Sequence, residues 1–100
     1  MSTENREVTT QNRDTVYIGK KPIMAYVTST LIQLSSSPQV NIKARGLSIG
    51  RAVDVAQIVV RRSDSRHSIG DIKIGSESLE SQDGKKRNVS TIEIAVKRNN

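Results

Sequence analysis

The chain has 100 residues, of which 34% are hydrophobic, and it contains two tyrosines but no Phe, Trp or Cys. This length is enough for one small domain with a modest aliphatic core, to which oligomerisation would add burial. The absence of cysteine excludes a disulfide framework and thiolate metal sites. No apolar run reaches the roughly 18 residues of a membrane span and no apolar signal stretch is present, so we expect a cytoplasmic protein without a membrane partner.

Basic residues outnumber acidic ones, and they are unevenly distributed along the chain. Sixteen Lys and Arg against ten Asp and Glu give a formal net charge of +6 at pH 7. Five of the basic residues, and no acidic one, lie between Thr15 and Val53. A basic composition alone occurs in proteins of many functions, but a segment with charge of one sign favours a polyanion such as DNA or RNA as the partner.

The N-terminal third consists of a polar tail, a strand, a turn and a helix. Residues 1–14 lack hydrophobic periodicity and are expected to be a disordered tail, which leaves residues 15–100 as the domain. Residues 15–18 are β-branched or aromatic and predict a strand. Residues 22–35 predict a helix with Pro22 at its first position. The apolar stripe of this helix consists of Ile23, Val27, Leu31 and Leu34, widened by Met24 and Ile32.

Two lysines occupy the turn between this strand and this helix. Lys20 and Lys21 directly precede Pro22, where the first backbone N–H groups of the helix lack partners and the helix dipole is positive. Ammonium groups beside such a helix start form a phosphate-sized anion site. The alternative interpretation is that both lysines are solvated turn residues without a ligand.

A second strand, basic turn and helix repeat this plan. Residues 39–44 alternate apolar and polar side chains, and residues 48–62 form an amphipathic helix with Ser48 as its N-cap. The functional candidates of this unit are Lys43, Arg45, Gly46 and Arg51. If the two strands are parallel neighbours, both turns emerge at the same edge of the sheet and the two basic sites converge.

The last third predicts a long β-hairpin. Residues 69–82 and 87–98 form its strands, with Asp83 and Gly84 as the turn signal. Isoleucines oppose each other near the base, whereas the outer half is polar and extends beyond the length of the helices, so it should project as an arm. The basic residues at the tip are Lys85, Lys86 and Arg87. The alternative is a mobile loop whose charges only maintain solubility.

These elements predict an α+β fold: a single two-layer domain of β-α-β-α-β-β order, with two helices packed on a mixed four-stranded sheet and a long projecting hairpin. Tyr17 and Tyr26 are expected to be partly buried strand and helix residues. His67 falls in a polar loop and is expected to face solvent. No set of residues indicates catalysis, a metal, a cofactor or a small-molecule substrate.

The order of the motifs resembles that of the Alba family, the small basic archaeal chromatin proteins that bind DNA and RNA. The matching motifs are Ile18-Gly19-Lys20-Lys21-Pro22, Ile42-Lys43-Ala44-Arg45-Gly46, Ala52-Val53-Asp54, Ser81-Gln82-Asp83-Gly84 and Val89-Ser90-Thr91-Ile92-Glu93-Ile94-Ala95. The resemblance covers nearly the whole chain beyond the tail. It implies a homodimer, or a heterodimer with a paralogue, whose lysine turns meet the nucleic-acid backbone while two hairpin arms reach along the minor groove.

The resemblance also assigns roles to single positions and reveals two departures. Lys20 matches an acetylation site of the family, and acetylation would weaken attraction to phosphate. The family's Arg-Gly-Arg turn has Leu47 in place of its second arginine, a loss that Arg51 would offset in part. Ser63 stands where many members have a phenylalanine that packs one dimer on the next, so cooperative side-by-side filaments are not expected.

Two functions remain open at this point. The first is sequence-independent binding of double-stranded DNA by a chromosome-associated architectural protein that condenses DNA, with a steep dependence on salt. The second is binding of structured RNA by its backbone, as an RNA chaperone or a ribonucleoprotein subunit. No zinc-finger spacing and no recognition helix indicates that base sequence is read.

Overall fold

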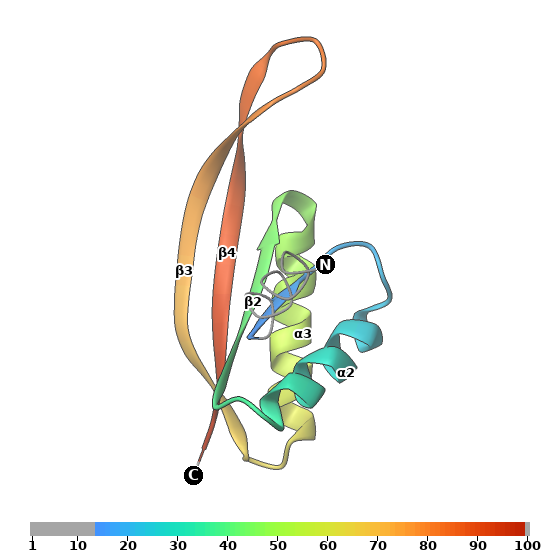
Figure 1. The fold of residues 1–100 in the computed structure, drawn as a ribbon, viewed down its shortest axis with the longest axis vertical. Coiled ribbons are helices and arrows are strands. Elements are labelled where there is room, and N and C mark those ends of the chain that lie inside the picture. The colour runs from blue at the N-terminus through green and yellow to red at the C-terminus, as the bar shows by residue number, and fades with distance from the viewer. Residues whose placement is uncertain (1–13, 100) are drawn as a thin grey trace, which may run out of the picture.

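The computed structural model describes residues 14–99, and residues 1–13 of the expected tail lie outside the described residues. The elements are β1 (Thr15–Tyr17), α2 (Ile23–Leu34), β2 (Gln39–Arg45), the 3-10 turn η1 (Gly46–Ser48), α3 (Ile49–Arg62), β3 (His67–Glu80) and β4 (Lys86–Arg98) (Figure 1). This is the predicted β-α-β-α-β-β order. No helix within residues 14–99 is long and apolar enough to cross a membrane.

The four strands form one mixed sheet in the order β1-β2-β4-β3. β1 and β2 pair in parallel, with Val16 opposite Ile42, whereas β2 with β4 and β3 with β4 pair antiparallel. A parallel pair requires a crossover connection, and α2 supplies it. The expected α+β fold with a mixed four-stranded sheet is therefore confirmed.

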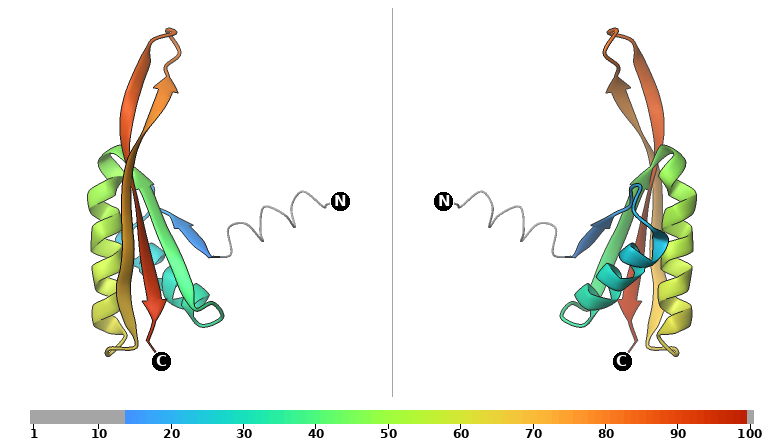
Figure 2. Two further views of the ribbon diagram at one scale, coloured as in Figure 1. Left: turned by 90° about the vertical axis from the view of Figure 1, so that its left-hand side faces the viewer. Right: turned by 90° about the vertical axis from the view of Figure 1, so that its right-hand side faces the viewer.

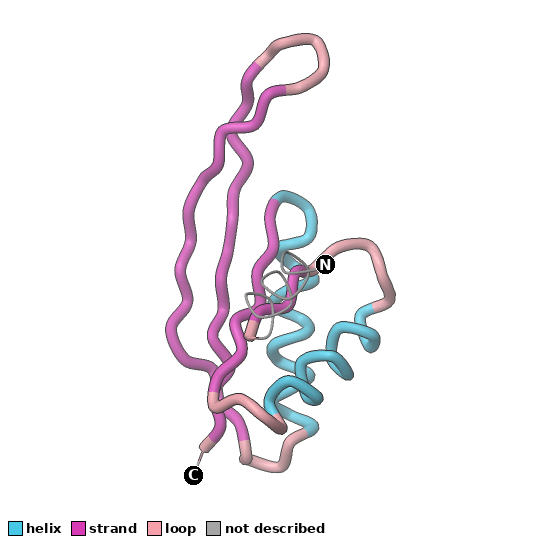
Figure 3. The backbone as a smooth tube through the Cα atoms, viewed as in Figure 1, coloured by secondary structure: helices cyan, strands magenta, loops and turns pink. Residues whose placement is uncertain are grey.

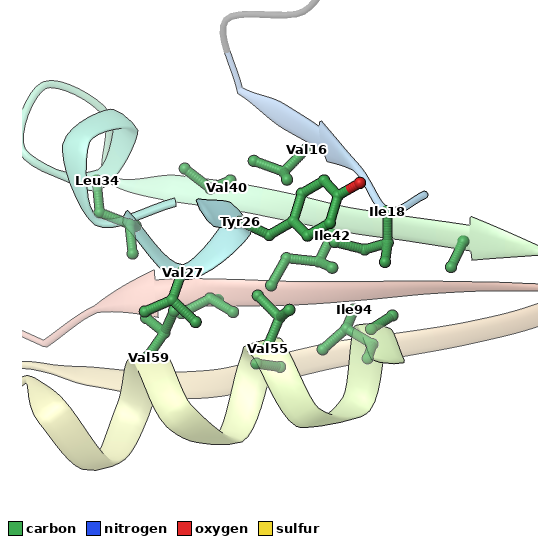
Figure 4. Packing of buried hydrophobic residues seen from close by; sticks show 14 residues of the cluster. Val16, Ile18, Tyr26, Val27, Leu34, Val40, Ile42, Val55, Val59 and Ile94 are labelled. Atoms are coloured by element: carbon green, nitrogen blue, oxygen red, sulfur yellow. The ribbon is translucent and has the colours of Figure 1, made fainter. Parts of the chain in front are cut away.

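The helices cover one face of the sheet and enclose an aliphatic core (Figure 4). Alternate residues of β2, Val40, Ile42 and Ala44, point into this layer and are buried. Val55 and Val59 of α3 face them and are fully buried. Each buried Val or Ile side chain contributes roughly 1.5–3 kcal/mol. The core therefore stabilises the body of the domain, and the outer hairpin contributes little to it.

Three apolar side chains are more exposed than the sequence predicted. Met24 and Ile32 of α2 are 43% and 64% exposed. The reason is that α2 packs on β1 and β2 at one edge of the sheet and on α3 along one side, which leaves its remaining surface in solvent. The expectation that Tyr17 is partly buried is also wrong, since 60% of it is exposed. Val16 and Ile18 point into the core, and the alternation of a strand then directs Tyr17 to the uncovered face of the sheet.

The starts of both helices differ from the prediction in detail. Pro22 is the N-cap of α2 rather than its first residue, since its φ of −56° is helical but its ψ of 145° is extended. Ser48 makes no capping hydrogen bond to α3 because it already has helical backbone angles within the turn η1. The backbone at both helix starts consequently has no side-chain cap.

The β3–β4 hairpin extends well beyond the N-terminal end of α3 (Figures 1 and 2). The strands stay paired from His67 opposite Arg98 to Glu80 opposite Lys86, with one irregularity between Ile69 and Ile72. The predicted projecting arm is thus a paired two-stranded ribbon. His67 is the first residue of β3 and not part of a loop, because its strand begins two residues earlier than the apolar pattern indicated.

Candidate nucleic-acid interface

Residues 18–22, here called the basic loop, connect β1 to α2 and carry Lys20 and Lys21 (Figure 3). Both lysine side chains are exposed, and neither forms an ion pair within the described residues. The helix begins directly after them without a side-chain cap and has no acidic residue in its first turn. Two free ammonium groups and unpaired backbone N–H groups therefore lie together, an arrangement suited to an anion.

The tyrosine of α2 holds the basic loop from the core side. The backbone N–H groups of Gly19 and Lys21 donate hydrogen bonds of 2.9 and 3.0 Å to the hydroxyl oxygen of Tyr26. The ring is 8% exposed, and its oxygen is directed towards the end of β1 beside Ile18 (Figure 4). Tyr26 is therefore a positioning residue for the loop, a role that the sequence pattern does not indicate.

Arg51 in the first turn of α3 holds the same loop from the second helix. Its Nε donates a 3.1 Å hydrogen bond to the carbonyl oxygen of Gly19, and a terminal guanidinium nitrogen donates to the carbonyl oxygen of Lys21. These bonds bring the start of α3 against the basic loop, so the two basic turns lie next to each other. Two of the five N–H donors of Arg51 are consequently engaged by the protein itself.

The second basic turn differs from the first because carboxylates neutralise its cations. The Arg45 guanidinium donates a 3.0 Å hydrogen bond to the Glu77 carboxylate, and the Lys43 ammonium lies 4.0 Å from the Glu93 carboxylate. Gly46 follows with a φ of +59°, a left-handed conformation that suits glycine. Leu47 is fully exposed where an arginine would add charge. This turn therefore presents less free positive charge than its composition suggests.

The hairpin tip carries a third group of cations at the far end of the molecule from the core (Figure 3). Lys85, Lys86 and Arg87 are all exposed and make no ion pair within the described residues. Hydrogen bonds from the Ser81 hydroxyl and the Lys85 backbone N–H hold the Asp83 carboxylate and lower its pKa. The turn is thus locally ordered, and its cations project without a carboxylate partner in the part of the chain that the structure describes.

Two further positions receive a structural explanation. Ser63, at the C-cap of α3, is 1% exposed and its hydroxyl donates to the carbonyl oxygen of Val60, so this side chain faces inward. Burial, and then repulsion by Arg66 and Arg98, lower the pKa of His67 below its ordinary value of 6.5. No group of three or more His, Cys, Asp or Glu residues within residues 14–99 is placed to hold a metal ion.

The chain is similar to known proteins over most of its length. The family model described as Alba matches residues 14–76. The DNA/RNA-binding protein Alba of Nitrosopumilus maritimus is 74% identical over 93 residues, which cover 92% of this chain and 98% of that protein. The DNA/RNA-binding protein Alba 1 of Archaeoglobus fulgidus is 46% identical over 84 residues, covering 83% and 93%. The solved structure of Alba from Thermoplasma volcanium aligns with a TM-score of 0.77 at 36% identity, covering 84% of this chain and 99% of that chain.

Proposed function

The chain belongs to the Alba family, and on this basis we propose that it binds double-stranded DNA without sequence preference, as an architectural protein of the chromosome. The observation that carries the proposal is the basic loop: Lys20 and Lys21 are exposed beside an uncapped helix start and have no carboxylate partner among the described residues. The backbone N–H groups of Gly19 and Lys21 donate to the Tyr26 hydroxyl, and Arg51 donates to the carbonyl oxygen of Gly19, so the backbone of the loop is fixed. A preorganised loop loses little conformational entropy when phosphates bind.

Phosphate contacts of this kind position a duplex without reading its bases. In this proposal the N-terminal end of α2, and not one of its faces, lies against the duplex. The cations of the hairpin tip lie on a paired two-stranded ribbon that is long enough to follow a groove. In this proposal Lys85, Lys86 and Arg87 contact the duplex in its minor groove. Affinity then derives mainly from release of counterions and falls steeply with salt.

A salt titration on duplexes of unrelated sequence tests the proposal. The variant Lys20→Ala/Lys21→Ala should bind every duplex about a hundredfold more weakly, since two charged contacts of about 1.5 kcal/mol each are lost. The slope of log affinity against log salt should decrease by about two. Unchanged affinity and slope would overturn the proposal, as would a loss restricted to one duplex sequence.

RNA is the second candidate ligand, favoured by the relatives whose names describe them as DNA/RNA-binding proteins. Structured RNA presents phosphates that the basic loop would meet in the same way, so we propose backbone recognition there too. The same titration with a hairpin RNA gives the ratio of the two affinities. A ratio strongly in favour of RNA at every salt concentration would point to an RNA chaperone or ribonucleoprotein subunit instead.

Acetylation of Lys20 is proposed as a modification that weakens this binding. The side chain is exposed at the apex of the basic loop, where an acetyltransferase can reach it. Acetylation removes one charge without altering the backbone that Tyr26 and Arg51 hold. Protein carrying acetyllysine only at position 20 should show a salt slope smaller by about one than unmodified protein. An unchanged slope would exclude a regulatory effect of the modification at this position.

We further propose that two copies form a dimer through the hairpin base. Ile72 and Ile74 are 56% and 83% exposed, yet they lie opposite Ile94 and Ile92 and so point to the same face of the sheet as the core. A second copy packed on these two isoleucines would bury the part of the apolar sheet face that the helices leave exposed. Light scattering of the unsubstituted chain at micromolar concentration should give the mass of a dimer. The variant Ile72→Lys/Ile74→Lys should give the mass of a monomer. The control Ile32→Lys, on exposed α2 surface, should leave the dimer intact; a monomeric unsubstituted chain would refute the proposal.

A further inference from the structure

The face of the sheet opposite the helices carries a mixed-charge groove that the proposed duplex contacts do not use. Tyr17, Lys43, Glu93 and Lys73 form one row across all four strands, because each lies opposite the next in the strand registers. This row borders a hollow of about 530 Å³, and we call it the outer groove. Its size lies within the range of small-ligand sites.

The outer groove is hollow because the residues at its base have small side chains. Gly75 has no side chain and pairs with Thr91, so the sheet has no large side chain at this point. Arg45 and Glu77, joined by their 3.0 Å contact, border the hollow towards the arm. The groove is therefore open to solvent on the side away from the helices and bordered by polar groups.

Tyr17 is the exposed aromatic side chain of this groove. Its ring is 60% exposed, and the Lys43 ammonium lies 5.9 Å from the ring centroid. The other tyrosine of the chain, Tyr26, is buried and uses its hydroxyl to hold the basic loop. The ammonium lies over one face of the ring. Exposed aromatic rings beside cations, on a sheet face without a covering helix, are surfaces on which unpaired bases stack.

We propose that the outer groove binds an unpaired nucleotide of a single-stranded nucleic acid, with its base stacked on Tyr17. The groove is lined by three cations and two carboxylates: Lys43, Lys73, Arg45, Glu77 and Glu93. Of the cations, Lys73 makes no ion pair within the described residues. The cations meet the phosphates on either side of the base. The Glu93 carboxylate accepts a hydrogen bond from an exocyclic amino group or a ribose hydroxyl.

The charge balance of the groove favours a nucleotide over the alternatives. A bare anion would meet two carboxylates as well as three cations, and it would have no use for the aromatic ring. A duplex keeps its bases stacked and paired, so it cannot offer one to Tyr17. The proposal concerns a separate surface from the basic loop, and it holds whether or not the loop binds duplex DNA.

Binding of a fluorescent oligouridine, compared with binding of a duplex, tests the proposal. Tyr17→Ala should weaken oligouridine binding by about tenfold, the loss expected for one stacked base, and change duplex binding by no more than about twofold. Tyr17→Phe keeps the ring and should bind like the unsubstituted chain. Ile32→Ala removes an equally exposed apolar side chain on α2 and should change neither affinity.

Several outcomes would overturn the proposal. These are an unchanged oligouridine affinity in Tyr17→Ala, an equal loss for oligouridine and duplex, or failure of Tyr17→Phe to restore binding. Loss of duplex binding in Lys20→Ala/Lys21→Ala with oligouridine binding retained would instead support two separate sites. Binding of the DNA counterpart, oligodeoxyuridine, distinguishes the two sources of an unpaired base. An affinity equal to that of oligouridine indicates that stacking alone contributes, whereas a weaker affinity indicates a contact to the ribose hydroxyl.

Photocrosslinking of the unsubstituted chain gives a readout that does not depend on a variant folding correctly. An oligouridine carrying 5-iodouracil, irradiated at long wavelength, links to an aromatic side chain against which the base is stacked. Mass spectrometry of the digested complex should place the link on Tyr17. Links confined to the basic loop or the hairpin tip would contradict the proposal.

Discussion

The basic loop and the outer groove contain similar numbers of cations but use them differently. In the basic loop, Lys20 and Lys21 are exposed and have no acidic partner within residues 14–99, and backbone N–H groups that donate to the Tyr26 hydroxyl hold the loop in place. In the outer groove, Lys43 and Arg45 each lie within 4.0 Å of a carboxylate. Free positive charge therefore concentrates in the loop, although the groove has three cations and the loop has two.

This difference shows that the number of basic residues is a poor measure of phosphate affinity. A cation that already has a carboxylate partner gains less from a phosphate, because the phosphate must displace that partner. A free ammonium group exchanges only water and counterions. The following substitutions each break or sharpen the contrast between the two regions.

Replacing Arg51 should have the largest effect of these substitutions, because it frees the basic loop from α3. Arg51→Ala loses the hydrogen bonds to the carbonyl oxygens of Gly19 and Lys21, and we expect duplex affinity to fall about tenfold. Amide hydrogen exchange at Gly19 should accelerate at the same time. Exchange measured by NMR, together with a binding titration, tests both effects.

Arg51→Lys separates positioning from direct contact with phosphate. Lysine keeps the charge but cannot donate to both carbonyl oxygens from a planar fork. If Arg51 acts by positioning, this variant should resemble Arg51→Ala in both exchange and binding. Full restoration of duplex affinity by lysine would show that the charge itself contacts the ligand.

Replacing Tyr26 should loosen the same loop from its other side. Tyr26→Phe leaves the N–H groups of Gly19 and Lys21 without their acceptor, which costs about 1–2 kcal/mol of unfolding free energy. The Tm should fall by roughly 5–15 °C in a domain of this size. Calorimetry is the measurement, with Tyr17→Phe as the matched control, because the exposed hydroxyl of Tyr17 should be dispensable. Equal melting of the two variants would refute the positioning role.

Removing a carboxylate partner should convert a paired cation into a free one. Glu77→Gln releases Arg45, so duplex affinity should rise about threefold and the salt slope should grow by about one. Glu80→Gln removes an exposed carboxylate of the same strand that makes no ion pair within the described residues. If both variants gain affinity equally, net charge and not pairing sets the affinity.

The smallest effect is expected at His67, which belongs to neither region. Its pKa is lowered in the folded protein, so the unfolded chain binds the proton more readily. Its contribution to stability is complete above pH 6.5 and is lost as the pH falls through its lowered folded-state pKa. His67→Gln should reduce the fall in Tm over that interval without altering duplex binding. An unchanged pH profile of Tm would contradict this assignment.

The sequence predicted the architecture well because the signals for it are local. The alternation along residues 39–44, the stripe of residues 23–34 and the Asp83-Gly84 turn each define an element without reference to the rest of the chain. The short links between the strands and helices then leave few possible topologies. Even so, Pro22 and Ser48 each have a different capping role from the one predicted, since helix ends depend on backbone geometry beyond the local pattern.

The site was harder to predict because its contacts join distant parts of the chain. Arg45 and Glu77 are 32 residues apart, as are Arg51 and Gly19, and no periodicity indicates such pairs. The exposed position of Tyr17, in contrast, follows from the residues beside it. Val16 and Ile18 on either side are the more reliable core residues, so a strand must turn Tyr17 the other way.

The most direct test of the role of the basic loop compares two double variants that remove the same net charge, Lys20→Ala/Lys21→Ala and Lys43→Ala/Arg45→Ala. Measurement of the salt dependence of duplex binding for both gives the number of phosphates that each pair neutralises. We predict a decrease in slope of about two for the loop variant and of less than one for the groove variant. Equal decreases, or a larger one for the groove variant, would contradict the claim that free cations of the basic loop carry duplex binding.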